Sequence, residues 1–377
     1  MIVPSFTSSF RKYAQAGSRA ILFLIILFTL DISIAALLGN LYSGIYVGPG
    51  RYNYIKRNRF DCLVMGSSTS RSLYDEIISQ SLGISVLNVG LDGAALIYSR
   101  CLLELVLRYN VAPKLILLNL DLFELRKTAW SGNFYSMIEY FAPLYGESEY
   151  IDKALQKGRL LEPLKYKLVS YKYNDLVLAI ILKKLQGEKE YRRELAPAGA
   201  LQLPIDEKIL REKFPDDEEI DQRKLALLDE FITVCKRNNI ALVVVTSPVF
   251  NPFHRKTNSD RAIENTLEKV TKDRGIPFIG VTQEKYSVFQ DPTMFSDVLH
   301  LNDKGSRLFS GLLCRELRSL FNPKSWIGRN YERGLSSSQA TSNLAHNLRA
   351  KISRRAISSC PLERLNVPRL QKNFIME

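Results

Sequence analysis

Residues Asp61–Ser70 read DCLVMGSSTS, and the fold class follows from this stretch and its continuation. Its first six residues form a short apolar run that ends at a glycine, which is typical of a buried β-strand. Residues 69–80 then place Leu73, Ile77 and Ile78 at helical spacing. A strand that leads directly into a helix begins a β-α-β unit.

The same alternation continues along the chain. Residues 84–90 (ISVLNVG) predict a second strand, 94–109 an apolar helix and 114–121 (KLILLNLD) a third strand. Beyond residue 220 we predict, in order, a helix at 221–237, a strand at 240–246, a helix at 260–274, a short strand at 277–280 and a helix from about 303 to 320. A β-α-β-α-β order implies a parallel sheet with right-handed crossovers. We expect an α/β fold with three layers, in which helices cover both faces of the sheet.

The alternation is interrupted between about Leu122 and Ile220, where no clear strand occurs. Helical stretches in this region carry many tyrosines, which more often pack than bind ligands. We predict a helical insertion that covers the carboxyl ends of the strands.

A long apolar segment precedes the α/β region. Ala20–Leu38 has nineteen residues broken by one charge, Asp31, and is about long enough to cross a bilayer. We favour an uncleaved transmembrane anchor over a signal peptide or a buried helix. Asp31 is costly in lipid, so it faces a partner helix or lies near the membrane interface.

Charges around this segment predict its orientation. Arg11, Lys12 and Arg19 precede it closely, whereas the first basic residue after it is Arg51. By the positive-inside rule residues 1–19 are cytoplasmic and the body lies outside. In a bacterium this is a single-pass protein of the inner membrane with an extracytoplasmic domain, joined to its anchor by a linker at 39–58.

The composition excludes several classes of protein. Of 377 residues 46% are hydrophobic and 24% are charged, as in globular proteins and unlike disordered, collagen-like or polytopic membrane chains. The net charge of +13 is concentrated beyond residue 323, where a serine-rich tail has ten basic and three acidic residues. We predict that residues 323–377 are disordered.

That basic tail raises the alternative of a nucleic-acid or anionic-lipid binder. Its basic residues, among them Arg349 and Lys351, lack interleaved aromatic side chains, so we expect no nucleic-acid partner. Five cysteines without close spacing and three scattered histidines favour neither a disulfide framework nor a metal site. We expect no metal and no cofactor.

Two short motifs carry the chemistry. Ser67, Ser68 and Ser70 follow the first strand, at the edge of the sheet where α/β proteins bind ligands. His300 lies just before the last helix, with Asp297 three residues upstream. Serines also cap helices, and an Asp-x-x-His pair also arises by chance. Together they give the order Ser…Asp…His, and in a sheet of order 2-1-3-4-5 the last segment returns beside the first strand. No G-x-S-x-G elbow is present.

With these motifs the region from about Arg59 to Leu320 resembles the SGNH (GDSL-like) hydrolases. It is most similar to their membrane-anchored bacterial branch, which includes relatives of the teichoic-acid D-alanyl transfer protein and of alginate acetylation proteins. The resemblance implies a flavodoxin-like SGNH domain at 59–322. Gly66-Ser67-Ser68 matches the family's Gly-Asp-Ser with Ser67 in place of aspartate, which makes Ser68 the nucleophile. By the same match His300 is the general base and Asp297 orients it.

The resemblance also implies an oxyanion hole. Residues 88–93 (NVGLDG) match the family's second block, so the N–H groups of Ser68 and Gly93 are the expected donors, with Gly93 preferred over Gly90. The family's third block, Gly-x-Asn-Asp, is absent. Asn119-Leu120-Asp121 stands in its place, and Asn119 is the candidate third donor.

The function that the resemblance implies is that of a serine esterase or O-acyltransferase. Its substrate is an extracytoplasmic polysaccharide or cell-envelope glycan, and its partner is a membrane-bound acyltransferase. The alternative is a catalytically silent SGNH-fold scaffold or carbohydrate-binding component of a polymer-assembly complex.

Overall fold

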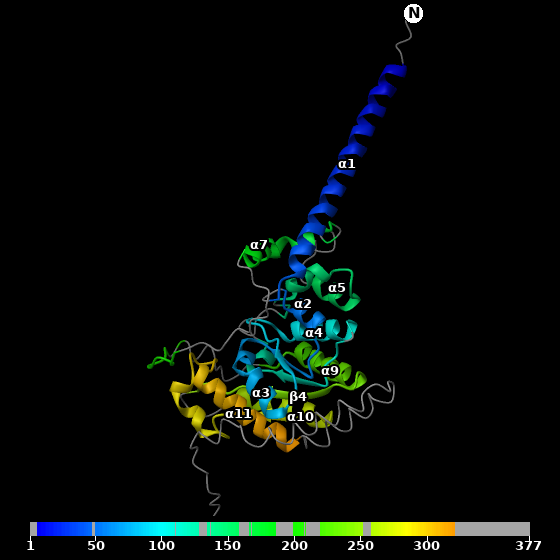
Figure 1. The fold of residues 1–377 in the computed structure, drawn as a ribbon. Helices are drawn as coiled ribbons and strands as arrows, with labels where there is room; N and C mark the ends of the chain where they lie inside the picture. The colour runs from blue at the N-terminus through cyan, green and yellow to red at the C-terminus, as the bar shows by residue number, and fades with distance from the viewer. Residues whose placement is uncertain are drawn as a thin grey trace, which may run out of the picture. The chain divides into compact units, whose positions relative to one another are not determined.

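The structure is a computed structural model, and it describes residues 6–46, 50–109, 111–127, 134–135, 137–157, 166, 168–185, 199–206, 208, 219–251 and 258–320. The chain divides into two compact units (Figure 1). The anchor unit comprises residues 1–57 and 137–192, and the sheet unit comprises residues 58–136 and 193–377. The predicted basic tail lies outside the described residues.

A five-stranded parallel sheet forms the centre of the sheet unit. Its strands are β1 (Cys62–Gly66), β2 (Val86–Asn88), β3 (Leu115–Asn119), β4 (Ala241–Thr246) and β5 (Phe278–Gly280). Their order is β2-β1-β3-β4-β5, and every neighbouring pair is parallel. The predicted α/β class and parallel sheet are confirmed, with strands that are one to four residues shorter than predicted.

The helices of this unit occur where the sequence periodicity places them. They are α3 (Asp75–Leu82), α4 (Leu96–Arg108), α9 (Gln222–Arg237), α10 (Asn258–Asp273) and α11 (Asp303–Leu320), with 3-10 turns η2 (Ser68–Ser72), η3 (Leu122–Leu125), η7 (Ser287–Gln290) and η8 (Pro292–Met294).

The helix predicted at 69–80 is split into η2 and α3. Leu73 and Tyr74 are extended between the two elements. The hydroxyls of Ser70 and Ser72 donate to backbone carbonyls three residues earlier. Serine side chains that bond to the local backbone in this way compete with a regular helix.

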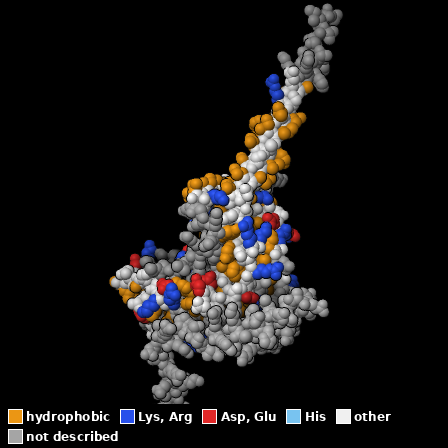
Figure 2. Space-filling view, in the orientation of Figure 1, with side chains coloured by type: hydrophobic (Ala, Val, Ile, Leu, Met, Phe, Trp, Pro, Cys, Tyr) orange, Lys and Arg blue, Asp and Glu red, His pale blue; other side chains and the backbone are white. Residues whose placement is uncertain are grey.

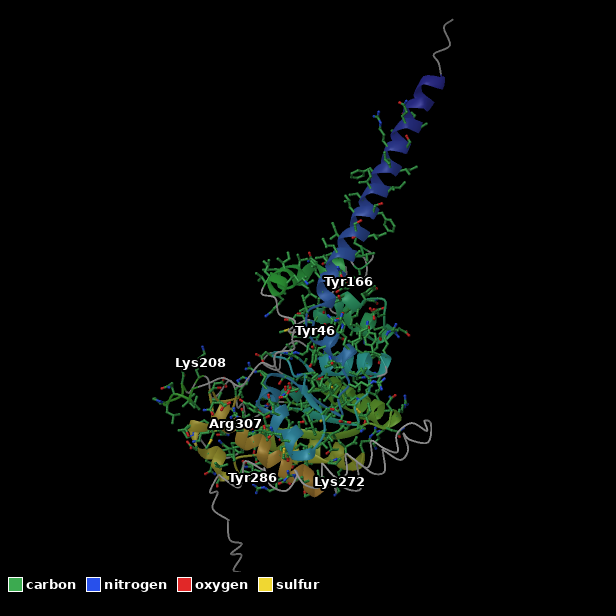
Figure 3. All side chains as sticks on the ribbon, viewed as in Figure 1. Tyr46, Tyr166, Lys208, Lys272, Tyr286 and Arg307 are labelled. Atoms are coloured by element: carbon green, nitrogen blue, oxygen red, sulfur yellow. The ribbon has the colours of Figure 1, made fainter. Side chains whose placement is uncertain are left out.

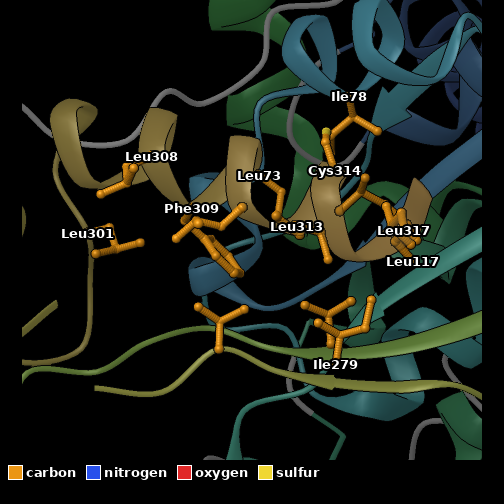
Figure 4. Packing of buried hydrophobic residues seen from close by; sticks show 14 of the residues in the cluster. Leu73, Ile78, Leu117, Ile279, Leu301, Leu308, Phe309, Leu313, Cys314 and Leu317 are labelled. Atoms are coloured by element: carbon orange, nitrogen blue, oxygen red, sulfur yellow. The ribbon is translucent and has the colours of Figure 1, made fainter. Parts of the chain in front are cut away.

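Every residue of β1 and β3 is buried. Since alternate residues of a strand point to opposite sides, both faces of the sheet are buried. On one face Cys62, Val64 and Leu117 belong to a core cluster with side chains of α3 and α11. Figure 4 shows Leu117 of this cluster with Ile78 of α3 and Leu313 and Leu317 of α11. The helices α4 and α9 contact each other and the strands β1 and β4, respectively. The four cysteines of the described residues, Cys62, Cys101, Cys235 and Cys314, are buried and form no disulfide with one another.

Helix α11 is fastened to the turn that follows β1. Ser310 Oγ donates to the carbonyl of Ser72 at 3.1 Å and accepts from the amide of Tyr74 at 2.8 Å. The Tyr74 hydroxyl in turn donates to the Asp303 carboxylate. The start of the last helix is therefore fixed relative to η2.

The anchor unit is helical in its described part. It contains α1 (Phe6–Ser43), α2 (Arg51–Arg57), η5 (Ile138–Leu144), α5 (Glu149–Gln156), η6 (Ser170–Leu176) and α7 (Val177–Leu185). Within α1 the segment Tyr13–Ser43 is long and apolar enough to cross a membrane, which is weak evidence for a single membrane anchor.

Within the predicted linker at 39–58 the structure describes residues 39–46 and 50–58. Helix α1 continues to Ser43, and α2 follows with Arg51 almost fully buried. Asn53 donates to the carbonyls of Tyr42 and Ile45 at 2.8 and 3.2 Å, which folds this segment back on α1. Buried polar contacts of this kind give the segment a fixed structure.

Part of the predicted insertion belongs to the same unit. Residues 137–192 group with the N-terminal segment, and the ring of Tyr173 packs against that of Tyr42. Tyr166, labelled in Figure 3, stacks on Tyr145 at 4.6 Å between ring centroids. These tyrosines pack, as predicted. The cover over the strand ends stays a prediction.

Gly66 has a backbone that only glycine adopts readily, with φ 147°, and a Cβ there would collide with the carbonyl of Asn119. We expect Gly66→Ala to lower the free energy of unfolding by more than about 3 kcal/mol. The control is Gly83→Ala. Gly83 also has positive φ, 68°, but its Cβ would meet open space, so only the backbone cost of about 1–2 kcal/mol applies. Denaturant unfolding of both variants measures the difference, and equal losses would contradict the steric argument.

Candidate active site

The structure brings Ser68, His300 and Asp297 into one hydrogen-bonded chain. Ser68 Oγ lies 2.7 Å from His300 Nε2, although the two residues are 232 positions apart. His300 Nδ1 lies 2.8 and 3.0 Å from the two carboxylate oxygens of Asp297. Asp297 accepts the Nδ1–H, so Nε2 presents its lone pair to the serine hydroxyl. This is the arrangement that activates a nucleophilic serine.

Ser68 is the accessible member of a group of hydroxyls. Ser67, Thr69 and Ser70 are buried, whereas Ser68 is half-buried. Ser70 donates to the carbonyl of Ser67 at 2.5 Å, and Thr69 donates to the carboxylate of Asp121. The backbone of η2 therefore turns the Ser68 hydroxyl toward the imidazole. The hydroxyls of Thr69 and Ser70 instead form hydrogen bonds inside the protein.

Asp297 and His300 lie on a short hairpin. An antiparallel bridge joins Phe295 to Leu301, both of which are buried in the core. The amide of Ser296 donates to the carbonyl of His300 at 2.9 Å. The hairpin sits directly before α11, so the contacts of that helix with η2 also position His300.

The carboxylate of Asp297 is fixed by its own turn. It accepts from the amides of Leu299 and His300 at 2.8 and 3.0 Å and from the imidazole. Partial burial raises the pKa of Asp297, but these hydrogen bonds outweigh burial and hold its pKa below the usual value. Asp297 is therefore ionised near neutral pH and accepts the hydrogen bond from His300 Nδ1.

Asn88 of the predicted second block stabilises the serine turn. Its Nδ2 donates to the carbonyls of Ser70 and Leu73 at 2.6 and 2.8 Å, and its Oδ1 accepts from the amide of Gly90 at 3.0 Å. A Cβ on Gly90 would collide with Ser70 Oγ. Gly90 is thus a packing glycine whose N–H contacts Asn88. Gly93 is exposed, and its role as an oxyanion donor stays a prediction.

Arg71 links the loop before Gly93 to the nucleophile. Its Nε lies 3.3 Å from the carbonyl of Ser68 and 2.9 Å from the carboxylate of Asp92. This bridge holds the residue that precedes Gly93 close to Ser68.

Asn119 has partners other than those predicted for it. The side chain is fully buried, with Nδ2 donating to Thr69 Oγ1 at 2.8 Å and Oδ1 accepting from Ser247 Oγ at 3.0 Å. These contacts hold it behind the serine turn. We therefore assign Asn119 a positioning role through Thr69 in place of the predicted contact with an oxyanion.

Two buried carboxyl groups beneath the turn were missed from the sequence. Asp121 accepts from Thr69 and from Ser67 Oγ at 3.3 Å, and Glu124 interacts with the same Ser67 hydroxyl. Burial raises the pKa of Asp121 to about 6. Burial, and next the nearby Asp121 charge, raise the pKa of Glu124 to about 8. Glu124 is thus mainly protonated near neutral pH. The only signal in the sequence is two acids inside the apolar run LDLFEL.

A small pocket of about 60 Å³ opens beside Asp121, at the carboxyl ends of β3, β4 and β5. Phe123 and Val249 line it and also pack against Val298 and Leu299, which lie between Asp297 and His300. A buried ion pair between Arg126 and Asp260 forms another part of its wall. The pocket therefore adjoins the catalytic hairpin.

His254 and His346 lie outside the described residues. Among the residues that the structure describes, no group of three or more His, Cys, Asp or Glu side chains is placed to hold a metal ion. No protein-family model matches the chain, and no curated protein matches it. The resemblance to the SGNH hydrolases therefore stays an expectation from the sequence motifs.

The raised pKa of Glu124 gives a pH dependence of stability. In the unfolded chain this carboxyl titrates near 4.5, whereas in the fold its pKa is about 8. The fold retains a proton that the unfolded chain loses, so the free energy of unfolding falls as pH rises from about 5 to about 8. We expect Glu124→Gln, which keeps the shape without the charge, to flatten this fall between pH 6 and 8. The control is Glu284→Gln, an exposed glutamate of the same unit. Denaturant unfolding across this range measures the slope, and an unchanged slope in Glu124→Gln would refute the assignment.

Proposed function

We propose that the chain is an SGNH-type serine esterase or O-acyltransferase with a flavodoxin-like catalytic domain. The observation that carries the proposal is the chain from Ser68 Oγ through the imidazole of His300 to the carboxylate of Asp297. The strand order β2-β1-β3-β4-β5 agrees with the fold that the resemblance implies. A half-buried serine at the carboxyl edge of a parallel sheet suits a nucleophile that must meet a substrate.

The first half of the reaction forms an acyl-enzyme. Ser68 Oγ attacks the carbonyl carbon of an ester while His300 Nε2 takes the hydroxyl proton. Asp297 stabilises the resulting imidazolium. The N–H groups of Ser68 and Gly93 are the proposed donors to the oxyanion. The tetrahedral intermediate then expels the alcohol, which receives its proton from His300, and the acyl group stays on Ser68.

The second half returns the enzyme to its starting state. Water or a sugar hydroxyl loses its proton to His300 Nε2 and attacks the ester carbonyl on Ser68. The bond to Ser68 Oγ breaks, and Oγ recovers its proton from His300. Water gives a free acid, whereas a sugar hydroxyl gives an O-acylated glycan. The same three side chains serve both outcomes.

The apolar helix α1 supports a proposal for the cellular location of this reaction. We propose that it anchors the chain in the inner membrane of a bacterium, with residues 1–19 in the cytoplasm and the sheet unit outside. The acceptor is then an extracytoplasmic polysaccharide or another cell-envelope glycan. A membrane-bound acyltransferase is the proposed source of the acyl group. The small pocket beside Asp121 supports an acyl group or sugar substituent of limited size.

A serine-reactive fluorophosphonate tests the nucleophile without knowledge of the substrate. We expect the full chain in detergent to form a single adduct, which peptide mass analysis places on Ser68. Ser68→Ala and His300→Ala should abolish the adduct, because the first removes the nucleophile and the second its base. The control is Ser79→Ala, which removes another half-buried serine of the sheet unit and should leave labelling unchanged.

The alternative of a catalytically silent scaffold gives a different result. A folded wild-type chain without an adduct on Ser68 would contradict the proposed chemistry. Glycan binding that survives Ser68→Ala in such a chain would then favour the scaffold.

The orienting role of Asp297 gives a separate prediction. In Asp297→Asn the amide cannot stabilise the imidazolium and can force the other imidazole tautomer. We expect the labelling rate to fall by roughly two to four orders of magnitude. Asp291→Asn is the matched control, since Asp291 accepts similar turn hydrogen bonds from Thr293 before the same hairpin. Equal rates in wild type and Asp297→Asn would exclude a triad.

A further inference from the structure

Helix α7 exposes an apolar surface that is unusual for a protein surrounded by water. Leu178 and Leu185 are 69% and 78% exposed, and Ile181 and Leu182 are also exposed. Only Ile180, which is fully buried, ties the helix firmly to its own unit. Exposed apolar patches of contiguous large side chains mark binding surfaces for protein or membrane.

Helix α7 continues from a turn that binds the one charge in the apolar segment of α1. The carboxylate of Asp31 accepts from the amides of Val169 and Ser170 at 2.7 and 2.9 Å and from the Ser170 hydroxyl. Both α7 and η6 contact α1. The carboxylate of Asp31, which would be costly in lipid without partners, is thus hydrogen-bonded at the start of η6.

These contacts fix the level of Val169 and Ser170 along α1, and α7 begins seven residues after Ser170 and contacts α1 as well. At 1.5 Å per residue, the segment Ala20–Leu38 extends about 28 Å, close to the thickness of the hydrocarbon layer. Asp31 lies seven residues before Leu38, which is about 10 Å along the helix axis. Helices that lie on membranes bury their apolar face at about this depth, 5–10 Å into the boundary between headgroups and acyl chains.

Figure 2 shows that the hydrophobic side chains of α1 and of the region of α7 lie on the same part of the anchor unit. On α1 the exposed apolar side chains extend from Ile21 to Leu37. Helix α7 adds a second group of exposed apolar side chains in the same unit. The polar residues of α7 are two lysines at its end, Lys183 and Lys184. Lysine stems extend along apolar surfaces and place the ammonium among anionic headgroups.

We propose that α7 lies in the outer interface of the lipid bilayer, with its exposed leucines among the upper acyl chains and its lysines at the headgroups. The hydrogen bonds of Asp31 attach the segment before α7 to the transmembrane helix α1. The lipid surface is favoured over a protein partner because the apolar surface of α7 is continuous with that of α1. The inference rests on the proposed membrane placement of α1.

Quenching of tryptophan emission by brominated lipids tests this placement in the full chain. The chain has two tryptophans, Trp130 and Trp326, which are first replaced by phenylalanine. Leu182→Trp then reports on α7 and Phe23→Trp on α1. The side chains of Leu182 and Phe23 are 47% and 59% exposed. Lys153→Trp on α5 is the control within the same unit, since the Lys153 side chain is 65% exposed. Each variant is reconstituted in vesicles of phosphatidylcholine and phosphatidylglycerol without another protein.

We expect lipids brominated near the headgroup to remove roughly half of the Leu182→Trp emission and to leave that of Lys153→Trp almost unchanged. Phe23→Trp should respond more to lipids brominated deep in the chain. If Phe23→Trp is quenched and Leu182→Trp is not, α7 does not contact lipid, the inference fails, and the anchor stands. If neither is quenched, the membrane placement of α1 fails as well. Equal quenching of Leu182→Trp and Lys153→Trp would also overturn the inference, because contact would not be specific to α7.

Discussion

The hydrogen bonds that join Ser310 to Ser72, the last residue of η2, and to Tyr74 just beyond it are the constraint on which the candidate site depends. They join the segment after β1, which carries Ser68, to the helix after the His300 hairpin. A serine and a histidine so far apart in sequence meet at 2.7 Å only if both segments are held, since flexible side chains lose rotamer freedom on pairing. The buried faces of α3 and α11 supply most of the apolar packing for this contact.

Beneath the serine turn the polar groups form a second layer. Asn88 binds the turn from β2, while Asn119 and Asp121 bind it from β3. A buried carboxylate without hydrogen bonds would cost several kcal/mol, so Asp121 persists because hydroxyls donate to it and Glu124 retains a proton. This layer fixes the backbone around Ser68 and places a negative charge behind the imidazole. Its parts come from β2, from β3 and from the turn that follows β3, so the geometry of Ser68 depends on both neighbours of β1 in the sheet.

Much of this could be predicted from the sequence, and the exceptions have physical causes. The short apolar strands could be predicted because both faces of the sheet are buried. The Ser…Asp…His order, together with the resemblance that selects Ser68, named the three side chains that the structure joins by hydrogen bonds. The break of the predicted helix 69–80 depends on serine hydroxyls that prefer backbone carbonyls to solvent, which periodicity does not record. The pairing of Asp121 with Thr69 is set by the register of β1 with β3. The packing of α2, η6 and α7 with α1 is likewise tertiary, so periodicity does not record it.

In the anchor unit, too, tertiary contacts decide the role of a single residue, the charged Asp31 in the apolar helix α1. From sequence alone Asp31 was expected either to face a partner helix or to lie near the membrane interface. In the fold its partners are the amides at the start of η6, the positive end of a helical segment that continues into α7. Such a pairing is strong where water is scarce, because competing solvent is absent and the donors have no other acceptor. A charge that lowers the apolar character of α1 thereby fixes the start of η6, the segment that leads into the second apolar helix, against it.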